Sequence, residues 1–347
     1  MLLTDSDNLN LVDQQRLYLI YEEWPKYFKD AANISSSCKL DREPDFYESI
    51  VFCGMGGSGT SCDILRDIIH TFSTLPSSVV RGQNMPYALN KHSLVIINSV
   101  SGNTKEAISN MEEATARKAE VICISSGGKL KDEANSNGHK HISIPNLALP
   151  RASLPYLVMP GLRLINPLLK DSIEEETLLI HSNLSRIFNN ISATVPYESN
   201  IAKKIAGFLH NSSLAFSFTS PYLVSVGTRF KNSLNENAKV HCLRESILEA
   251  SHNEIVPFTF NDSNSPYKAL LHRWAEDRPL VRERFNNVKA FFNEIGQPLI
   301  EIITTEKSLI NAIISSIYIL DYATIYMAVT RNVDPSPTPA IDILKKM

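Results

Sequence analysis

The first candidate for chemistry is a glycine-rich run, Gly54-Met55-Gly56-Gly57-Ser58-Gly59, that follows a short apolar stretch. Its spacing fits G-x-G-x-x-G, the pattern of dinucleotide-binding loops, in which glycines let the backbone approach a pyrophosphate. Such folds also carry an acidic residue about 20 positions on, which binds the ribose. The corresponding region, Leu75 to Arg81, contains no acid. We therefore do not expect NAD, although binding of the 2′-phosphate of NADP by Arg81 stays open.

A second run, Ser99-Val100-Ser101-Gly102-Asn103-Thr104, follows another apolar stretch and precedes a helical pattern. It has hydroxyl side chains at alternate positions and a glycine that lets the backbone approach a ligand. The amino end of a helix attracts anions through its free N–H groups. The run is therefore typical of an anion site, and two such loops after adjacent strands can hold one phosphate. The alternative for Ser101 or Thr104 is that its hydroxyl only caps the helix.

Both runs lie where short apolar stretches alternate with helical patterns, which predicts a parallel sheet with helices on both faces. The same rhythm returns in the second half of the chain, so the expected fold class is α/β. The expected strands are 50–53, 78–80, 94–97, 121–124, 142–144, 214–218, 269–271 and 299–303. The expected helices are 9–32, with a break near Pro25, and 61–72, 104–118, 161–194, 222–235 and 280–295.

A proline-rich segment separates the two halves. Its prolines are too closely spaced for a regular element, because proline lacks the backbone N–H that helices and strands use. They are Pro145, Pro150, Pro155 and Pro160. A connector is predicted there, with a first domain over residues 1–155 and a second over 156–347.

The bulk composition excludes several classes of protein. The 347 residues are 43% hydrophobic and 20% charged, with a formal net charge of -3. These values fit a globular protein of two domains and give no basic face for nucleic acid. Five cysteines without a CxxC pair predict reduced thiols, and the first residues show no signal-peptide pattern, so we expect a cytoplasmic protein. Polar residues such as Asn311 and Asp321 in the apolar segment 309–329 favour a buried helix over a membrane span.

The two loops resemble those of the sugar isomerase (SIS) domain family. Within it, the chain is similar to the bifunctional phosphoglucose/phosphomannose isomerases found largely in archaea. The further stretches that carry this resemblance are Pro150-Arg151-Ala152, Asn235-Glu236-Asn237, His252-Asn253, and Pro337-Thr338-Pro339 leading to Leu344-Lys345. The two loops are common to SIS proteins, whereas the later stretches in this order are far more specific. A mild departure is Val100, where family members often carry tyrosine.

The resemblance implies two SIS domains, each a doubly wound, flavodoxin-like parallel sheet, in a homodimer with active sites near the interface. It also implies hexose 6-phosphate substrates and no cofactor or metal. The residues that would bind the phosphate are Gly56, Gly57, Ser58, Ser99, Ser101 and Thr104. Arg151 would face the reacting oxygens at C1 and C2, and Glu236 would move the proton. His252 and Lys345 would help open the sugar ring, and Thr338 is the position tied to acceptance of both C2 epimers.

The chemistry of aldose–ketose interconversion agrees with these residue types. A carboxylate can carry a proton between C1 and C2 through a cis-enediol, and a guanidinium can stabilise the negative oxygen. Histidine suits ring opening, because it donates or accepts a proton near neutral pH. Taken singly, each of these residues also fits an ordinary surface or capping position, and only their combination with the phosphate loops favours catalysis.

Two other functions stay open at this stage. One is a non-catalytic sugar-phosphate sensor, which would have phosphate loops without a base. The other is a different SIS isomerase that acts on an amino-sugar phosphate. His139 and His141 are two residues apart, so on a strand they would point to the same side and could bind a metal ion together. No third ligand accompanies them, which favours a pair of surface histidines over a metal site.

Overall fold

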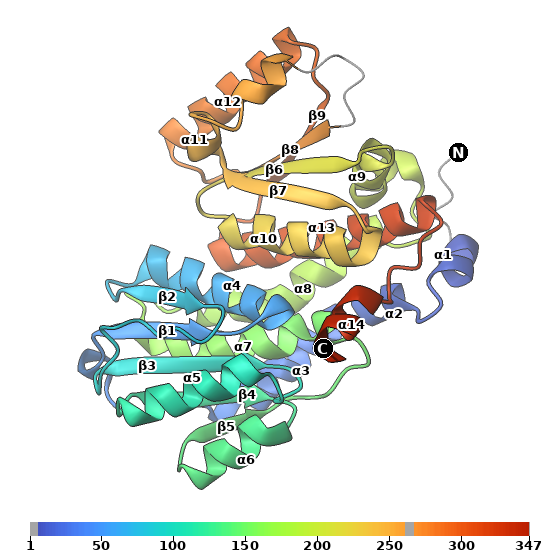
Figure 1. Ribbon diagram of the computed structural model, residues 1–347. Helices are drawn as coiled ribbons and strands as arrows, with labels where there is room; N and C mark the ends of the chain where they lie inside the picture. Colours follow the sequence, from blue (N-terminus) through green and yellow to red (C-terminus); the bar gives the residue numbers. More distant parts are fainter. Residues whose placement is uncertain (1–5, 261–266, 347) are drawn as a thin grey trace. The chain divides into compact units, whose positions relative to one another are not determined.

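The computed structural model describes residues 6–260 and 267–346. The chain divides into two compact units (Figure 1). The first unit consists of Trp24–His181, and the second of Met1–Glu23 together with Ser182–Met347.

The first unit is built on a five-stranded parallel sheet in the order β2-β1-β3-β4-β5. Its strands are β1 (Ser49–Cys53), β2 (Ser77–Val80), β3 (Ser93–Ser99), β4 (Glu120–Ser125) and β5 (Lys140–Ser143). Helices α4 (Gly56–Phe72) and α7 (Leu154–Ile165) cover one face, and α5 (Lys105–Ala116) and α6 (Gly128–Ser136) cover the other (Figure 1). This is the flavodoxin-like strand order that the family resemblance implies.

The core of the first unit explains why its strands are apolar throughout. On one face, alternate residues of β1, β3 and β4 pack against Ala107, Met111 and Leu130 of α5 and α6. The residues between them face α4 and α7, so strands such as β3 are buried along their whole length. A strand covered on both faces needs apolar side chains at every position, which is the pattern in the sequence.

The second unit has a four-stranded parallel sheet in the order β7-β6-β8-β9. Its strands are β6 (Leu214–Thr219), β7 (His241–Ser246), β8 (Tyr267–Trp274) and β9 (Leu299–Thr304). Helices α11 (Ile247–Ala250) and α12 (Pro279–Glu294) cover one face, and α10 (Val224–Ser233) and α13 (Leu309–Thr330) cover the other (Figure 1). The remaining helices are α1 (Ser6–Val12), α2 (Leu17–Glu22), α8 (Glu174–Ile191), α9 (Ile201–Leu209) and α14 (Pro339–Lys346), with α3 (Trp24–Ile34) in the first unit. Two α/β units agree with the predicted fold class.

Helix α13 is long and apolar enough to cross a membrane by length and composition. However, 94% of its most apolar window is buried inside the structure. It packs against α9, α10 and α2 of the second unit. The sequence prediction of a buried core helix agrees with this packing.

A helix was predicted over residues 9–32 with a break near Pro25, and a break does occur there, at Glu23. The amino-terminal segment has a further break that was not predicted. It forms α1, α2 and α3, and the break between the first two lies at Arg16, which has a left-handed backbone with φ of 54°. There the carboxylate of Asp13 accepts a hydrogen bond from the backbone N–H of Tyr18 at 2.9 Å. Pro25 lies in the first turn of α3, where no backbone N–H is needed.

The proline-rich segment is also more regular than predicted, since it contains the buried helix α7. Pro155 is in the first turn of this helix, and Pro160 lies inside it. Helix α7 packs against α3 and α4, so the first unit extends to His181, and the compact units differ from the predicted division at residue 155. Strand β7 and helices α6 and α9 are further elements that the sequence patterns did not predict.

Candidate active site

The first loop connects β1 to α4 and is folded too tightly for side chains at two of its glycines. A Cβ atom added to Gly54 would lie 2.8 Å from the backbone of Ser58. One added to Gly59 would lie 2.9 Å from the carbonyl oxygen of Gly54. Gly56 has a left-handed backbone with φ of 52°. The glycines therefore allow a very short connection, after which Gly56, Gly57 and Ser58 are the first residues of α4.

The second loop connects β3 to α5 and holds its hydroxyl groups through local hydrogen bonds. The hydroxyl oxygens of Ser99 and Thr104 lie 3.0 Å apart. The backbone N–H of Asn103 donates to Ser101 Oγ at 3.2 Å. Ser99 is buried and Ser101 is exposed, so the row of hydroxyls runs from the sheet edge outward.

The two loops contact each other at the same edge of the sheet. Strands β1 and β3 are adjacent and parallel, so their carboxyl ends lie side by side. The backbone N–H of Val100 donates to Ser58 Oγ at 3.4 Å and links the loops. From β1 the chain passes to β2 on one side, whereas from β3 it passes to β4 on the other. Ligands of doubly wound folds bind at such a switch point.

The amino ends of two helices meet this edge. Among the described residues, no side chain accepts a capping hydrogen bond from the first turn of α4 or of α5. The first N–H groups of a helix have no acceptor within the helix, and its dipole adds a partial positive charge there. Both helices therefore present N–H donors to an anion. Thr104 occupies the N-cap position of α5, but its hydroxyl does not form a capping hydrogen bond.

Arg81 lies against the first loop, just past the end of β2. Its guanidinium forms an ion pair with the buried carboxylate of Asp63 in α4 and lies 3.4 Å from the carbonyl oxygen of Gly59. A Cβ atom on Gly59 would come within 3.1 Å of Arg81 Nε. Arg81, which the sequence left open as an NADP contact, is thus part of the framework of this loop.

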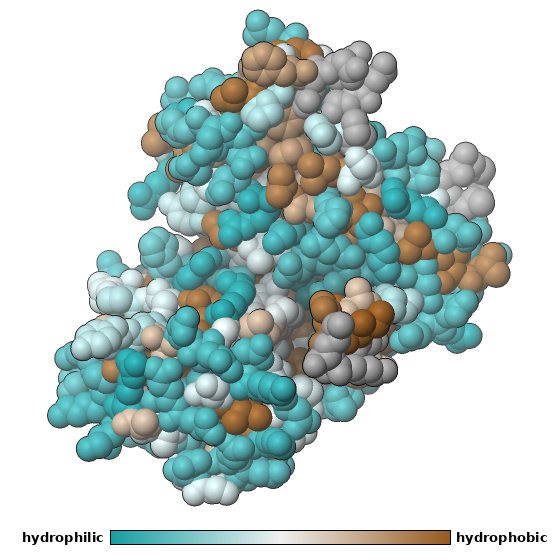
Figure 2. Space-filling model, viewed as in Figure 1, coloured by the Kyte–Doolittle hydropathy of each residue, from teal (hydrophilic) through white to brown (hydrophobic). Residues whose placement is uncertain are grey.

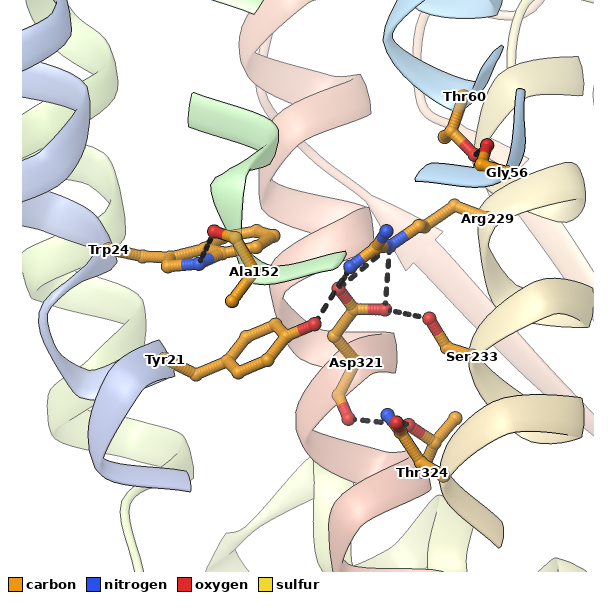
Figure 3. Close-up of polar contacts among 10 residues, drawn as sticks. Tyr21, Trp24, Gly56, Thr60, Ala152, Arg229, Ser233, Asp321 and Thr324 are labelled. Atoms are coloured by element: carbon orange, nitrogen blue, oxygen red, sulfur yellow. Dashed lines mark hydrogen bonds and ion pairs between the residues drawn. The ribbon is translucent and has the colours of Figure 1, made fainter. Parts of the chain in front are cut away.

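Arg151 belongs to the same unit as the two loops. It lies in a 3-10 turn, Pro150–Ser153, that packs against α4. The indole N–H of Trp24 donates to the carbonyl oxygen of Ala152 at 3.0 Å and fixes this turn (Figure 3). The side chain of Arg151 is largely buried. The first unit therefore brings together the six proposed phosphate-binding residues and carries the proposed guanidinium on a neighbouring turn.

Glu236 lies in the second unit, at the point where helix α10 widens into a π-helical turn, Leu234–Ala238. Its side chain is half-buried, between exposed Asn235 and buried Asn237. The turn ends at Lys239, which has a left-handed backbone with φ of 55°. Lys239 Nζ donates to the carbonyl oxygens of Glu236 and of Pro335, the latter at 3.2 Å. The turn that carries Glu236 is therefore tied to the segment that leads to Thr338.

A buried polar network lies beside this turn (Figure 3). Arg229 Nη2 donates to Asp321 Oδ2 at 2.8 Å, and Arg229 Nε donates to the same oxygen at 3.0 Å. Ser233 Oγ donates to Asp321 Oδ1 at 2.6 Å, and Arg229 Nη2 also donates to Tyr21 Oη at 2.7 Å. Burial opposes the charge on Arg229, but the attraction of Asp321 outweighs it and the pKa of Arg229 is raised overall.

The other proposed catalytic residues of the second unit are more exposed. His252 is exposed in a turn after α11, with its backbone N–H bonded to the carbonyl oxygen of Glu249 at 2.9 Å. Glu236 precedes the amino end of β7 and His252 follows its carboxyl end, so the structure does not bring these two residues together within this unit. Thr338 directly precedes α14 and is half-exposed. Lys345 belongs to α14, and its side chain lies outside the described part of the structure.

Helix α14 also carries a small apolar patch, visible over this helix in Figure 2. Its exposed apolar residues are Ile341, Ile343 and Leu344. The segment that leads into the helix is anchored by Ser336, whose hydroxyl donates to Asp13 Oδ1 at 3.2 Å.

Comparison with known proteins agrees with this architecture. A SIS domain model matches residues 47–146, and the model of the bacterial phospho-glucose isomerase C-terminal SIS domain matches residues 198–347. A bifunctional phosphoglucose/phosphomannose isomerase from Caldicellulosiruptor bescii is 30% identical over 343 residues, which cover 95% of this chain and 97% of that protein. The chain belongs to this isomerase family.

Two further comparisons concern a more distant curated protein and a solved structure. A D-glucosamine-6-phosphate 4-epimerase from Sulfolobus acidocaldarius is 28% identical over 255 residues, covering 71% of this chain and 74% of that protein. The crystal structure of a hypothetical protein from Thermus thermophilus matches with a TM-score of 0.73 at 14% identity, over 94% of this chain and 88% of that chain. The structural match shows the shared fold of two SIS units.

His139, which directly precedes β5, and His141, within β5, have ordinary partners. His139 Nε2 lies 2.6 Å from Thr115 Oγ1, and His141 Nε2 lies 2.7 Å from Ser125 Oγ. Burial lowers the pKa of both imidazoles. The described residues contain no group of three or more histidine, cysteine or acidic side chains that could hold a metal ion.

The buried network around Asp321 is the part of the candidate site that sequence reasoning did not identify. Arg229, Ser233 and Asn237 are spaced by four residues, as on one face of a helix. The polar residues in the otherwise apolar α13 are the signal that could have revealed it, because a buried polar group needs a partner. From the sequence alone, these polar residues indicate only that the segment does not span a membrane.

Proposed function

We propose that this protein interconverts glucose 6-phosphate and mannose 6-phosphate with fructose 6-phosphate through a cis-enediol, without a metal ion. The observation that carries the proposal is the pair of glycine- and hydroxyl-rich loops in contact at the β1–β3 switch point, in a chain of this isomerase family. An isomerase of hexose 6-phosphates needs such a loop pair, because the phosphate is the part that all its substrates share.

The phosphate group is bound by backbone N–H groups and hydroxyls of the first unit. Gly56, Gly57 and Ser58 contribute the amino end of α4. Ser99, Ser101 and Thr104 contribute hydroxyls before α5. Hydrogen bonds to a charged phosphate are about twice as strong as neutral ones, so this part of the molecule supplies binding energy that does not depend on the sugar.

The proton transfer is assigned to Glu236, which removes the proton from one carbon of the C1–C2 unit and returns it to the other. A single carboxylate can perform both steps, because the enediol has no stereocentre at C2. Arg151 stabilises the negative charge that develops on the C1 and C2 oxygens. Thr338 permits rotation about the C1–C2 unit, so that both epimers are accepted.

Ring opening is assigned to His252 and Lys345, which exchange protons with the ring oxygen and the C1 hydroxyl.

We further propose that the protein is a cytoplasmic homodimer with its active sites near the interface. Analytical ultracentrifugation of the purified chain tests the oligomeric state, because the molar mass measured for a dimer is twice the 38.8 kDa of one chain.

The activity is tested by a coupled assay that detects fructose 6-phosphate. We expect turnover of glucose 6-phosphate and of mannose 6-phosphate at similar KM, unchanged by EDTA. Loss of turnover with EDTA, restored by zinc, would contradict the metal-independent mechanism. Tight binding of hexose 6-phosphates without turnover would favour a sensor, and turnover of glucosamine 6-phosphate alone would favour an amino-sugar enzyme.

A further inference from the structure

The buried face of α10 and its π-helical turn forms a ladder of hydrogen bonds with one turn of α13. Arg229 and Ser233 donate to the carboxylate of Asp321. One turn further along, Asn237 Nδ2 donates to Thr324 Oγ1 at 2.9 Å. All five side chains are at most 2% exposed. The ladder therefore lies in the interior of the second unit and continues directly into the turn that carries Glu236.

The hydrogen bonds of Thr324 determine which partner donates in the last contact of this ladder. Its hydroxyl donates to the carbonyl oxygen of Asp321 in its own helix at 2.7 Å. The single hydroxyl proton is thus used, so the oxygen faces Asn237 as an acceptor. Asn237 in turn has a fully buried amide, one N–H of which is satisfied by Thr324. The sequence position next to Glu236 is therefore fixed to α13 with a defined polarity.

The turn is closed by its own backbone hydrogen bonds. The carbonyl oxygen of Leu234 accepts the N–H groups of both Lys239 and Val240 where the turn ends, the latter at 3.2 Å. A π-helical turn has poorer hydrogen-bond geometry than an α-helix and persists where surrounding contacts hold it, frequently at functional sites. Here the bond from Asn237 to Thr324 is such a surrounding contact, and it lies directly beside Glu236.

The ladder also places a buried charge near Glu236. The carboxylate of Glu236 contributes to the raised pKa of Arg229, after the larger effects of burial, Asp321 and Tyr21. The two side chains therefore interact electrostatically, although Arg229 is paired with Asp321. A buried ion pair adds little stability in general compared with apolar packing, which points to a role in positioning.

We propose that the Asn237–Thr324 hydrogen bond, backed by Arg229 and Asp321, holds the π-helical turn in the geometry that aims Glu236 at the substrate carbon. Asn237 and Thr324 are positioning residues and do not touch the substrate. This inference rests on the proposed role of Glu236 as the base. It predicts that loosening the ladder lowers kcat, while phosphate binding by the first unit is retained.

The test is Thr324→Val, which keeps the shape and removes the hydroxyl. We expect kcat to fall on the order of 10- to 100-fold with KM within about 3-fold, because small displacements of a catalytic group have effects of this size. The affinity for inorganic phosphate should not change. Thr324→Ser, which restores the hydroxyl, should recover most of kcat.

Thr304→Val is the matched control. Thr304, in β9, shares a hydrogen bond with Ser316, which lies in the same helix as Thr324, and both side chains are buried. Loss of the Thr304 hydroxyl should therefore lower the stability by a similar amount, but at a place away from the π-helical turn. We expect Thr304→Val to lower the melting temperature as much as Thr324→Val but to keep kcat. Equal losses of kcat in the two variants, or a wild-type kcat in Thr324→Val, would overturn the proposal.

Amide hydrogen exchange separates this inference from the proposed activity. Peptides that cover residues 234–240 should exchange faster in Thr324→Val than in Thr304→Val, and this readout needs no turnover. If exchange rises there but the wild-type protein has no isomerase activity, the proposed function fails and the ladder is still shown to hold the turn. If exchange in this segment does not change, the positioning role is wrong.

Discussion

Ser99 and Thr104 bond to each other across the second loop, with their hydroxyl oxygens 3.0 Å apart. The two hydroxyls have two protons, and their mutual hydrogen bond uses one of them. The other proton remains a donor for an oxygen at the loop. Thr104 thus acts as part of a donor pair and not as a helix cap, which supports the phosphate-binding role over the capping alternative.

The first prediction concerns these hydroxyls. Ser101→Ala and Thr104→Val should each weaken the binding of glucose, mannose and fructose 6-phosphates by the same factor. Each loses a hydrogen bond to the phosphate, worth about 1.5–3 kcal/mol when one partner is charged. Calorimetric titration with the sugar phosphates and with inorganic phosphate measures these affinities.

Thr115→Val is the control, because Thr115 lies in the same helix α5 and its hydroxyl forms hydrogen bonds with Met111 and His139. Unchanged phosphate affinity in Ser101→Ala and Thr104→Val would contradict the assignment.

A second prediction uses two glycines of the first unit that share a left-handed backbone. Gly102 has φ of 65° and Gly138 has φ of 73°. A Cβ on Gly102 would lie 1.7 Å from the carbonyl oxygen of Gly127, whereas one on Gly138 would meet nothing within 4 Å. Gly138→Ala should cost about 1–2 kcal/mol of stability from backbone strain alone. Gly102→Ala should cost more and should also weaken phosphate binding, because the second loop must move.

Equal stability losses in the two glycine variants, or phosphate affinity reduced in both, would mean that the contact with Gly127 does not shape the loop. Thermal melts with and without inorganic phosphate supply both measurements, since a ligand that binds only the folded state raises the melting temperature.

The third prediction concerns the buried ion pair. Asp321→Asn should destabilise the protein by about 3–5 kcal/mol, because it leaves the guanidinium of Arg229 buried without a charged partner. The double variant Arg229→Met/Asp321→Leu should be more stable than Asp321→Asn, since it removes both charges. Denaturant unfolding of the variants measures the difference. A double variant that is less stable than the single one would show that an unpaired Arg229 is not the cause of the loss.

The fourth prediction is a pH dependence from His272 in β8. Its ring is buried against Phe230, and neither ring nitrogen has a hydrogen-bond partner among the described residues. Burial lowers the pKa of His272 to about 3, whereas an unfolded histidine titrates near about 6.5. As pH falls, His272 therefore binds a proton in the unfolded state before it does so in the folded state. The stability contribution is complete above about pH 6.5 and declines by about 1.4 kcal/mol per pH unit below it.

His272→Leu removes this titration and provides the comparison. Between about pH 7.5 and about pH 5, the wild type should lose about 2 kcal/mol of unfolding free energy more than the variant. Parallel pH dependences of the two proteins would show that His272 is able to ionise in the folded state.

The sequence predicted the two loops after β1 and β3 well because their signals are local. Apolar runs define β1 and β3, and glycines and hydroxyls directly follow them. The strand β7 was missed because it is an edge strand, where polar residues such as Arg244 and Glu245 are tolerated. Helix α7 was missed because its packing against α3 and α4 overrides the unfavourable prolines.

The π-helical turn and the ladder could not be predicted from local patterns. The bond between Asn237 and Thr324 joins residues 87 positions apart, and the turn depends on such distant contacts. The resemblance to the isomerase family identified Glu236 as a candidate, but it did not indicate which residues hold it. Long-range partners of this kind require the three-dimensional structure.

The last prediction tests Glu236 itself. Glu236→Gln should abolish isomerisation and leave sugar-phosphate binding largely intact, because the amide keeps the shape of the side chain but cannot accept a proton from carbon. Loss of a general base typically lowers the rate by about 10²- to 10⁴-fold. Glu283→Gln, an exposed carboxylate of α12, is the control and should keep wild-type turnover.

Isotope exchange makes this test independent of the overall equilibrium. In deuterated water, the wild-type protein should exchange the C2 proton of glucose 6-phosphate, because the proton held by Glu236 in the enediol complex can pass to solvent. Glu236→Gln should show neither turnover nor exchange, yet a hexose 6-phosphate should still raise its melting temperature. Exchange that persists in this variant would assign the base to another residue. Loss of both exchange and thermal protection would mean that the substitution disturbs substrate binding, and that the role of Glu236 is not limited to proton transfer.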